Sequence, residues 1–87
     1  MKVSVWDTYV QRNDGKVMHF DILVPATIVE ADKVFAYGKA YLKEKPFKYG
    51  GLSAKECQFC HIEQATQEIE DSINQKGFYI IEMQNCD

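Results

Sequence analysis

Two β-like runs joined by a short polar segment constrain the fold of this chain most. Residues 2–10 (KVSVWDTYV) alternate as a strand does, and residues 17–24 (VMHFDILV) form a second β-like run. Between them stands Asp14-Gly15, a pair typical of a type I′ hairpin turn, because both central positions of that turn need positive φ. The chain is therefore predicted to begin with a β-hairpin.

The turn also predicts how the two strands pair. A two-residue loop places Tyr9 opposite Phe20, and one face of the hairpin is then apolar except for Asp7. A slip of one residue would invert every side chain and mix the two faces. We therefore expect Asp7 on the apolar face, and His19 with Asp21 together on the second, half-polar face.

A helix is predicted after the hairpin. Thr27-Ile28-Val29-Glu30 has the form of a capping box, and Pro46 blocks a helix beyond about Glu44. Apolar residues recur at helical spacing between these limits and predict a buried stripe.

The second half of the chain predicts a strand, a helix and a strand. Residues 55–62 alternate and lack an apolar helical stripe, so we expect a strand, although Ser53-x-x-Glu56 could also start a helix. A helix over 65–76 should end at Gly77, which suits a left-handed cap. The dense apolar run at 78–83 predicts a central strand.

The order ββαβαβ indicates an α+β fold. We expect a four-stranded mixed sheet, with the last two strands as parallel neighbours and both helices packed on one face. The chain has 87 residues, which fits a single domain over 1–87, and 46% of them are apolar, which suffices for a modest core.

The segment ECQFCHIE contains the one motif with specific chemistry, C-x-x-C-H. Parallel strands at 55–62 and 78–83 would end at one edge of the sheet and bring the tail Cys86 near the motif. A zinc hypothesis then assigns Cys57, Cys60, His61 and Cys86 as a structural or regulatory ligand set. Against it, Cys57 and Cys60 point to opposite faces of a regular strand.

The same motif has three other interpretations. Haem attachment is not expected, because the N-terminus lacks an export signal. Thiol–disulfide chemistry at the CxxC is the alternative function, but the flanking Glu56 and Glu63 raise a thiol pKa rather than lower it. The third interpretation is that the cysteines are buried as small apolar side chains without metal.

Three further polar residues are candidates for a site. His19 and Asp21 share a face at i, i+2, an arrangement in which a carboxylate can orient an imidazole. Asp7 stands on the otherwise apolar face, where a carboxylate needs a hydrogen bond or a raised pKa. Capping by Asp7, and an exposed polar patch around His19, are the structural alternatives.

The charge and hydropathy of the chain limit the classes of binding partner that we expect. The net charge is −3, and a basic stretch at residues 39–55 lacks an RNA-binding motif, so nucleic acid is not expected. No apolar run is long enough to span a membrane. We expect a cytoplasmic protein with reduced thiols. An exposed edge strand or apolar face would support a homodimer.

Four blocks together resemble a known family. They are DTYV at 7–10, DGKVMHFD at 14–21, ECQFCH at 56–61 and GFYIIEM at 77–83. In this combination the chain resembles the DUF2024 family of small bacterial domains of unknown function. Where relatives carry Pro-Pro at the start of the second helix, this chain has Thr66-Gln67. The resemblance implies a compact α+β domain and brings no activity, so we expect a binding or interaction module rather than an enzyme.

Overall fold

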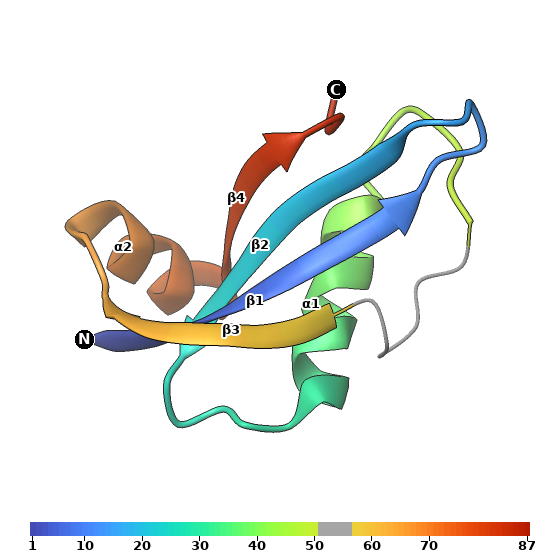
Figure 1. The fold of residues 1–87 in the computed structure, drawn as a ribbon. Helices are drawn as coiled ribbons and strands as arrows, with labels where there is room; N and C mark the ends of the chain where they lie inside the picture. The colour runs from blue at the N-terminus through green and yellow to red at the C-terminus, as the bar shows by residue number, and fades with distance from the viewer. Residues whose placement is uncertain (51–56) are drawn as a thin grey trace.

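The fold alternates strands and helices in the predicted order (Figure 1). The computed structural model describes residues 1–50 and 57–87. Its elements are β1 (Lys2–Gln11), β2 (Val17–Pro25), α1 (Ala31–Leu42), β3 (Cys57–Gln64), α2 (Gln67–Lys76) and β4 (Tyr79–Gln84). The predicted strand over 55–62 is therefore confirmed from Cys57 onward. Its first two residues, and the alternative helix start at Ser53, lie outside the described residues.

The four strands form one antiparallel sheet in the order β3-β1-β2-β4. The prediction of a mixed sheet is wrong. Figure 1 shows β3 and β4 at opposite edges, with the N-terminal hairpin between them. Because β4 pairs with β2 and β3 pairs with β1, the last two strands are not neighbours, and no parallel pair arises.

The hairpin register differs from the predicted one by a single residue. The turn has three residues, 13–15, closed by a hydrogen bond from Arg12 N to Lys16 O of 2.8 Å. Gly15 adopts the left-handed conformation with φ of +90°, as the third residue of such a loop usually does. Thr8, and not Tyr9, is therefore the partner of Phe20.

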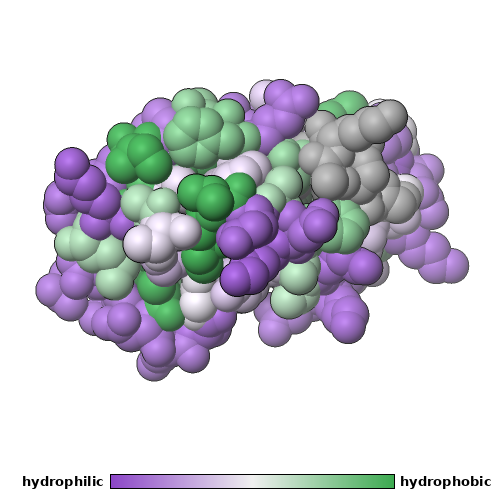
Figure 2. All heavy atoms as spheres, turned by 90° about the horizontal axis from the view of Figure 1, so that it is seen from below, coloured by the Kyte–Doolittle hydropathy of each residue, from purple (hydrophilic) through white to green (hydrophobic). Residues whose placement is uncertain are grey.

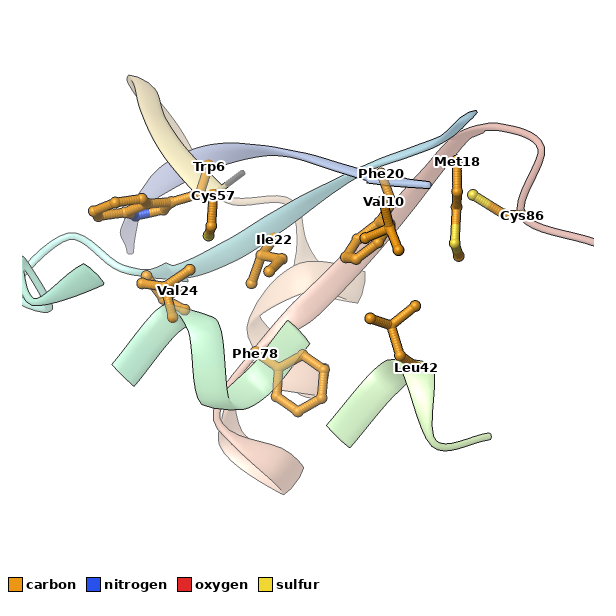
Figure 3. Close-up of a cluster of buried hydrophobic side chains, with 11 residues drawn as sticks. Trp6, Val10, Met18, Phe20, Ile22, Val24, Leu42, Cys57, Phe78 and Cys86 are labelled. Carbon is orange, nitrogen blue, oxygen red and sulfur yellow. The ribbon is translucent and has the colours of Figure 1, made fainter. Parts of the chain in front are cut away.

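The one-residue shift distributes apolar residues over both faces of the sheet. One face packs against α1, with Phe20, Ile22 and Val24 pointing toward this helix (Figure 3). The other face packs against α2, where Ile69 and Ile73 contact side chains of β1 and β2. The helices therefore pack on opposite faces, and the prediction of both helices on one face is wrong. Neighbouring residues of a strand point to opposite sides, so β1 and β2 supply apolar residues to both faces.

The helix ends show which capping signals operate. Helix α1 begins at Ala31 behind Glu30, which makes no side-chain cap, so the capping box predicted at Thr27 is wrong. Helix α2 begins behind Thr66, whose Oγ1 accepts a hydrogen bond from Ile69 N at 3.3 Å. Gly77 ends α2 in the predicted left-handed conformation. Neither of these two helices is long and apolar enough to cross a membrane.

Gly77 is constrained by packing as well as by its backbone. Replacing Gly77 with alanine should lower the free energy of unfolding by about 1–3 kcal/mol, because a left-handed L-residue costs about 1–2 kcal/mol. The new Cβ would also lie 2.8 Å from the hydroxyl oxygen of Tyr37. The control is Gly15→Ala, which has nearly the same φ but meets nothing within 4 Å. Urea unfolding should show the larger loss at Gly77, and equal losses would contradict the packing contribution.

Candidate functional site

One sheet face carries a polar cluster that lies beyond the part covered by α2, and neither helix of the described residues packs over it. On this face, α2 covers the end of the hairpin that contains Val3, Val5 and Leu23. Further along the same face lie Asp7, His19 and Asp21. Asp7 stands directly opposite Asp21, and His19 is two residues from Asp21 on β2. The register therefore brings together three polar residues that the predicted register had divided between two faces.

The three side chains converge on one point. Nε2 of His19 lies 3.6 Å from Oδ1 of Asp21 and 3.8 Å from Oδ1 of Asp7. One ligand atom from each residue fits within 4.8 Å, and this is the one group of three or more such ligands found in residues 1–50 and 57–87. These distances exceed those of a normal hydrogen bond, about 2.7–3.2 Å. The imidazole is therefore close to both carboxylates without being hydrogen-bonded to either.

Two of the converging atoms are enclosed and unsatisfied. Nε2 of His19 and Oδ1 of Asp21 are buried and lack a hydrogen-bond partner within the described part of the chain. The side chains of His19 and Asp21 are only 18% and 14% exposed, whereas Asp7 is 39% exposed. Buried polar atoms are nearly always paired, so unsatisfied atoms at one point need a specific explanation.

Neighbouring groups hold the imidazole in place. The ring of Tyr9 stacks on the ring of His19, with centroids 4.2 Å apart and planes inclined by 10°. The main-chain carbonyl of His19 accepts a hydrogen bond from the Cys86 thiol at 3.3 Å. The side chain and the backbone of His19 are thus each fixed by a contact, so its Nε2 has a defined direction.

Burial sets the charge of the cluster. It raises the pKa of Asp21 to about 6, with further contributions from a hydrogen bond with Asp7 and from the charge of Asp7. His19 and His61 act in the opposite direction. Two carboxylates at close range cannot both ionise freely, so the pair retains a proton more readily than an isolated aspartate does. The site therefore favours a positive charge between the two carboxylates.

Asp21→Asn should stabilise the protein at pH 8 by about 1 kcal/mol, because the variant no longer ionises at this site and solvent screening of a partly exposed group keeps the effect small. The pKa of Asp21 is raised in the folded state, from 3.8 to about 6. Wild-type stability therefore falls as the pH rises from about 4 to about 6, and the gain of the variant should vanish near pH 4. Urea unfolding in chelator at both pH values measures this. Glu44→Gln, which removes an exposed carboxylate next to α1, should give no gain at pH 8.

A bulge in β3 brings further polar residues to the same face. The register between β1 and β3 shifts between Val5 and Trp6. Phe59 pairs with Trp6 and His61 pairs with Val5, so Cys60 is the extra residue of the bulge. A bulge of this kind re-aims side chains. After burial, the carboxylates of Asp7 and Asp21 contribute to a raised pKa of the Cys60 thiol.

The other side of β3 is apolar. Phe59 and Ile62 are about half exposed and, with Trp6 and Val29, line a groove of about 260 Å³ beside the connection from β2 to α1. Figure 2 shows apolar side chains gathered around this hollow. The bulge thus separates a polar side of β3, which adjoins the cluster, from an apolar side at the edge of the sheet.

Cys60, His61 and Glu63 form a short chain of contacts. Nδ1 of His61 lies 3.2 Å from the Cys60 sulfur, and Nε2 of His61 lies 2.9 Å from Oε1 of Glu63. Partial burial, followed by the charge of Asp7 and a hydrogen bond with it, raises the pKa of the Cys60 thiol. The thiol is therefore protonated at neutral pH, with an imidazole nitrogen in contact with it.

The structure does not bring the four predicted zinc ligands together. Cys57 is buried and accepts a hydrogen bond from Thr8 Oγ1 at 3.6 Å. Cys86 is also buried, and Figure 3 shows Cys57 beside Trp6 but Cys86 beside Met18, at opposite ends of the same core cluster. Cys60, by contrast, is exposed. The sheet order explains this placement, because the strands that precede and follow α2 lie at opposite edges.

The positions of Cys57 and Cys60 also test the predicted thiol–disulfide chemistry of the CxxC motif. Cys57 points into the core that contacts α1, and burial raises the pKa of its thiol. Cys60, three residues further along β3, is exposed. One thiol is buried and the other exposed, so the geometry does not favour a bond between the two sulfurs.

Comparisons with known proteins agree with this fold. A family model described as a domain of unknown function (DUF2024) matches residues 1–83. The chain is also similar to protein NE1680 from Nitrosomonas europaea, a Northeast Structural Genomics Consortium target solved by NMR. The two are 34% identical, the match covers 100% of each chain, and the TM-score is 0.85. No curated protein matches the chain.

Proposed function

The chain belongs to the DUF2024 family, which is described without an activity, and we propose from its own geometry that it is a binding module for one divalent transition-metal ion. The ligands are Asp7, His19 and Asp21. The observation that carries the proposal is the pair of enclosed, unsatisfied atoms, His19 Nε2 and Asp21 Oδ1, which converge with Asp7 Oδ1.

The observed spacing supports a metal ion. Donor atoms around a tetrahedral zinc ion, with bonds of about 2.0–2.2 Å, lie roughly 3.3–3.6 Å apart. The separations of 3.6 and 3.8 Å between His19 Nε2 and the two carboxylates need only a small contraction to reach this range. A divalent cation would also neutralise the two facing carboxylates and give each enclosed atom a partner.

A protonated imidazole is the structural alternative to a metal. Imidazolium between two carboxylates would balance part of their charge, but it leaves the distances too long for hydrogen bonds. Such an ion pair would therefore satisfy neither enclosed atom, whereas coordination satisfies both. This difference favours the metal.

Binding is favoured over catalysis by the surroundings of the site. The cluster lies on an open sheet face, with Asp7 39% exposed, while the apolar groove that could enclose an organic substrate lies on the other side of the sheet. The proposal therefore assigns the site to holding a metal, and not to a reaction of the metal.

The test is a zinc titration of protein first stripped with chelator. Wild type should bind one ion per chain by calorimetry, and Asp7→Asn/Asp21→Asn should bind none, because two of three ligands lose their charge. The matched control, Asp32→Asn/Asp71→Asn, removes two carboxylates from the helices and should bind as wild type does. Binding by the first double variant at wild-type affinity, or no binding by wild type, would refute the proposed function.

A further inference from the structure

The edge strand β3 is open along most of its length. It pairs with β1 on one side, and no strand of residues 1–50 and 57–87 pairs with its other side. Every residue of β3 after Cys57 is exposed. The outer backbone groups of an edge strand can pair with another chain, and β3 contains neither the lysine nor the proline that often prevents this. The partner that fits this edge is therefore another extended strand.

Apolar side chains lie along one side of this edge. Phe59 and Ile62 are 53% and 47% exposed and line the groove of about 260 Å³ together with Trp6 and Val29. The indole N–H of Trp6 already donates to Ser4 Oγ at 3.1 Å, so the groove offers mainly apolar contact. Pockets for small molecules measure roughly 300–1,000 Å³, so this smaller groove better suits a single side chain.

The bulge gives the side chains of β3 a pattern that is the same from both ends. Opposite residues of an antiparallel pair point to the same side, so the partners on β1 define each direction. The groove side carries Cys57, Phe59, Ile62 and Gln64, and the other side carries Gln58, His61 and Glu63. The Cys60 sulfur lies 3.2 Å from Nδ1 of His61, so these two side chains lie together at the centre. Reversal of the strand about the midpoint between Cys60 and His61 therefore maps each side onto itself.

We infer that β3 pairs in antiparallel orientation with β3 of a second copy of this chain, about a two-fold axis between Cys60 and His61. Phe59 then lies opposite Ile62 of the second copy, and Ile62 lies opposite its Phe59, the self-complementary contact that a two-fold axis requires. Glu63 lies opposite Gln58 of the second copy, so no like charges meet. The two sheets join into one continuous sheet, and the inference does not depend on the proposed metal site.

Other two-fold registers fit less of the strand. Centring the pair on Phe59 would place Cys57 opposite His61, and centring it on Ile62 would place Cys60 opposite Gln64. Each of these pairs joins side chains from different sides of the strand, which an antiparallel pair does not allow. The axis between Cys60 and His61 keeps all eight residues of β3 in matching directions.

Sedimentation equilibrium tests the inference, in chelator and reductant so that neither a bridging metal nor a disulfide contributes. With rising concentration, wild type should approach twice the 10.0 kDa of one chain. Phe59→Glu and Ile62→Lys each bring an unpaired charge into the apolar contact and should raise the dissociation constant at least about tenfold. The matched control is Met83→Lys, which changes a 54% exposed apolar residue on the opposite edge strand β4 and should dimerise as wild type does.

A 1:1 mixture of the first two variants tests the register. The carboxylate introduced at position 59 then faces the ammonium group introduced at position 62, and the second contact is the native pair, so dimers should form again. Wild type that stays monomeric up to about 1 mM would overturn the inference and leave the edge to a strand of another protein. Single variants that dimerise as wild type does, a mixture that stays monomeric, or an equal loss in Met83→Lys would also overturn it. None of these results bears on the proposed function, because no metal is present.

Discussion

Replacing His19 with alanine should weaken zinc binding by at least about 100-fold, since even residues that only support metal ligands cost 10–100-fold when they are changed. His19 supplies the one nitrogen of the proposed three-ligand set, and its Nε2 lies 3.6 and 3.8 Å from carboxylate oxygens of Asp21 and Asp7. Without it, Asp7 and Asp21 would face each other across a gap with two oxygen ligands. Calorimetric titration of chelator-stripped protein measures the loss.

Gln84→Ala is the matched control for this variant. Gln84 stands opposite His19 on β4 and is exposed, so its truncation removes a neighbouring polar side chain that is not a proposed ligand. Its zinc affinity should stay within about threefold of wild type, as expected for a surface change of roughly 0.5 kcal/mol. An equal loss in both variants would mean that strand distortion, and not ligation by His19, weakens binding.

Phe20→Ala should lower the free energy of unfolding by about 3–5 kcal/mol, because truncation of a buried aromatic residue removes apolar contacts and leaves a cavity. Phe20 is the largest of the fully buried side chains and lies in a central strand. Its ring also contacts the ring of Tyr41 on α1, with centroids 4.7 Å apart. For a domain with roughly 5–15 kcal/mol of total stability, this is a large fraction.

Phe59→Ala gives the comparison for the core variant. Phe59 is 53% exposed and makes an edge-to-face contact with Trp6 at 5.8 Å. Its truncation should cost at most about 1.5 kcal/mol, the value of a single aromatic pair. Urea unfolding followed by circular dichroism measures both variants. A loss at Phe59 as large as that at Phe20 would contradict the placement of Phe20 in the buried core and of Phe59 at the exposed edge of the sheet.

The order of the elements could be predicted from local signals. Alternation marked the strands, and Gly77 marked the end of α2 because a left-handed cap accepts glycine without strain. Predictions from local signals were wrong where one segment of the sequence was compatible with two different local structures. Thr27 and Glu30 had the spacing of a capping box. In the structure, residues 25–28 form a turn with a hydrogen bond from Ile28 N to Pro25 O, and the helix begins only at Ala31.

The wrong prediction of the register between β1 and β2 was the error that affected the candidate site. The prediction assumed that one face of the hairpin is buried and chose the turn that makes this face apolar. In the structure, α1 and α2 cover different faces, so apolar residues are needed on both. Allowing a three-residue turn with glycine in third place would have paired Asp7 with Asp21 and placed His19 beside them. The individual residues were identified from the sequence, but not their convergence.

The sequence by itself determined the six elements, the hairpin and the set of polar residues from which a site could be built, because strand alternation and glycine conformation are local properties. Only the tertiary structure decided which polar residues meet. The sheet order separates Cys57 from Cys86, and the hairpin register gathers Asp7, His19 and Asp21 on one face. These arrangements depend on which strands exchange hydrogen bonds and on which faces the helices cover, and residues distant in the chain settle both.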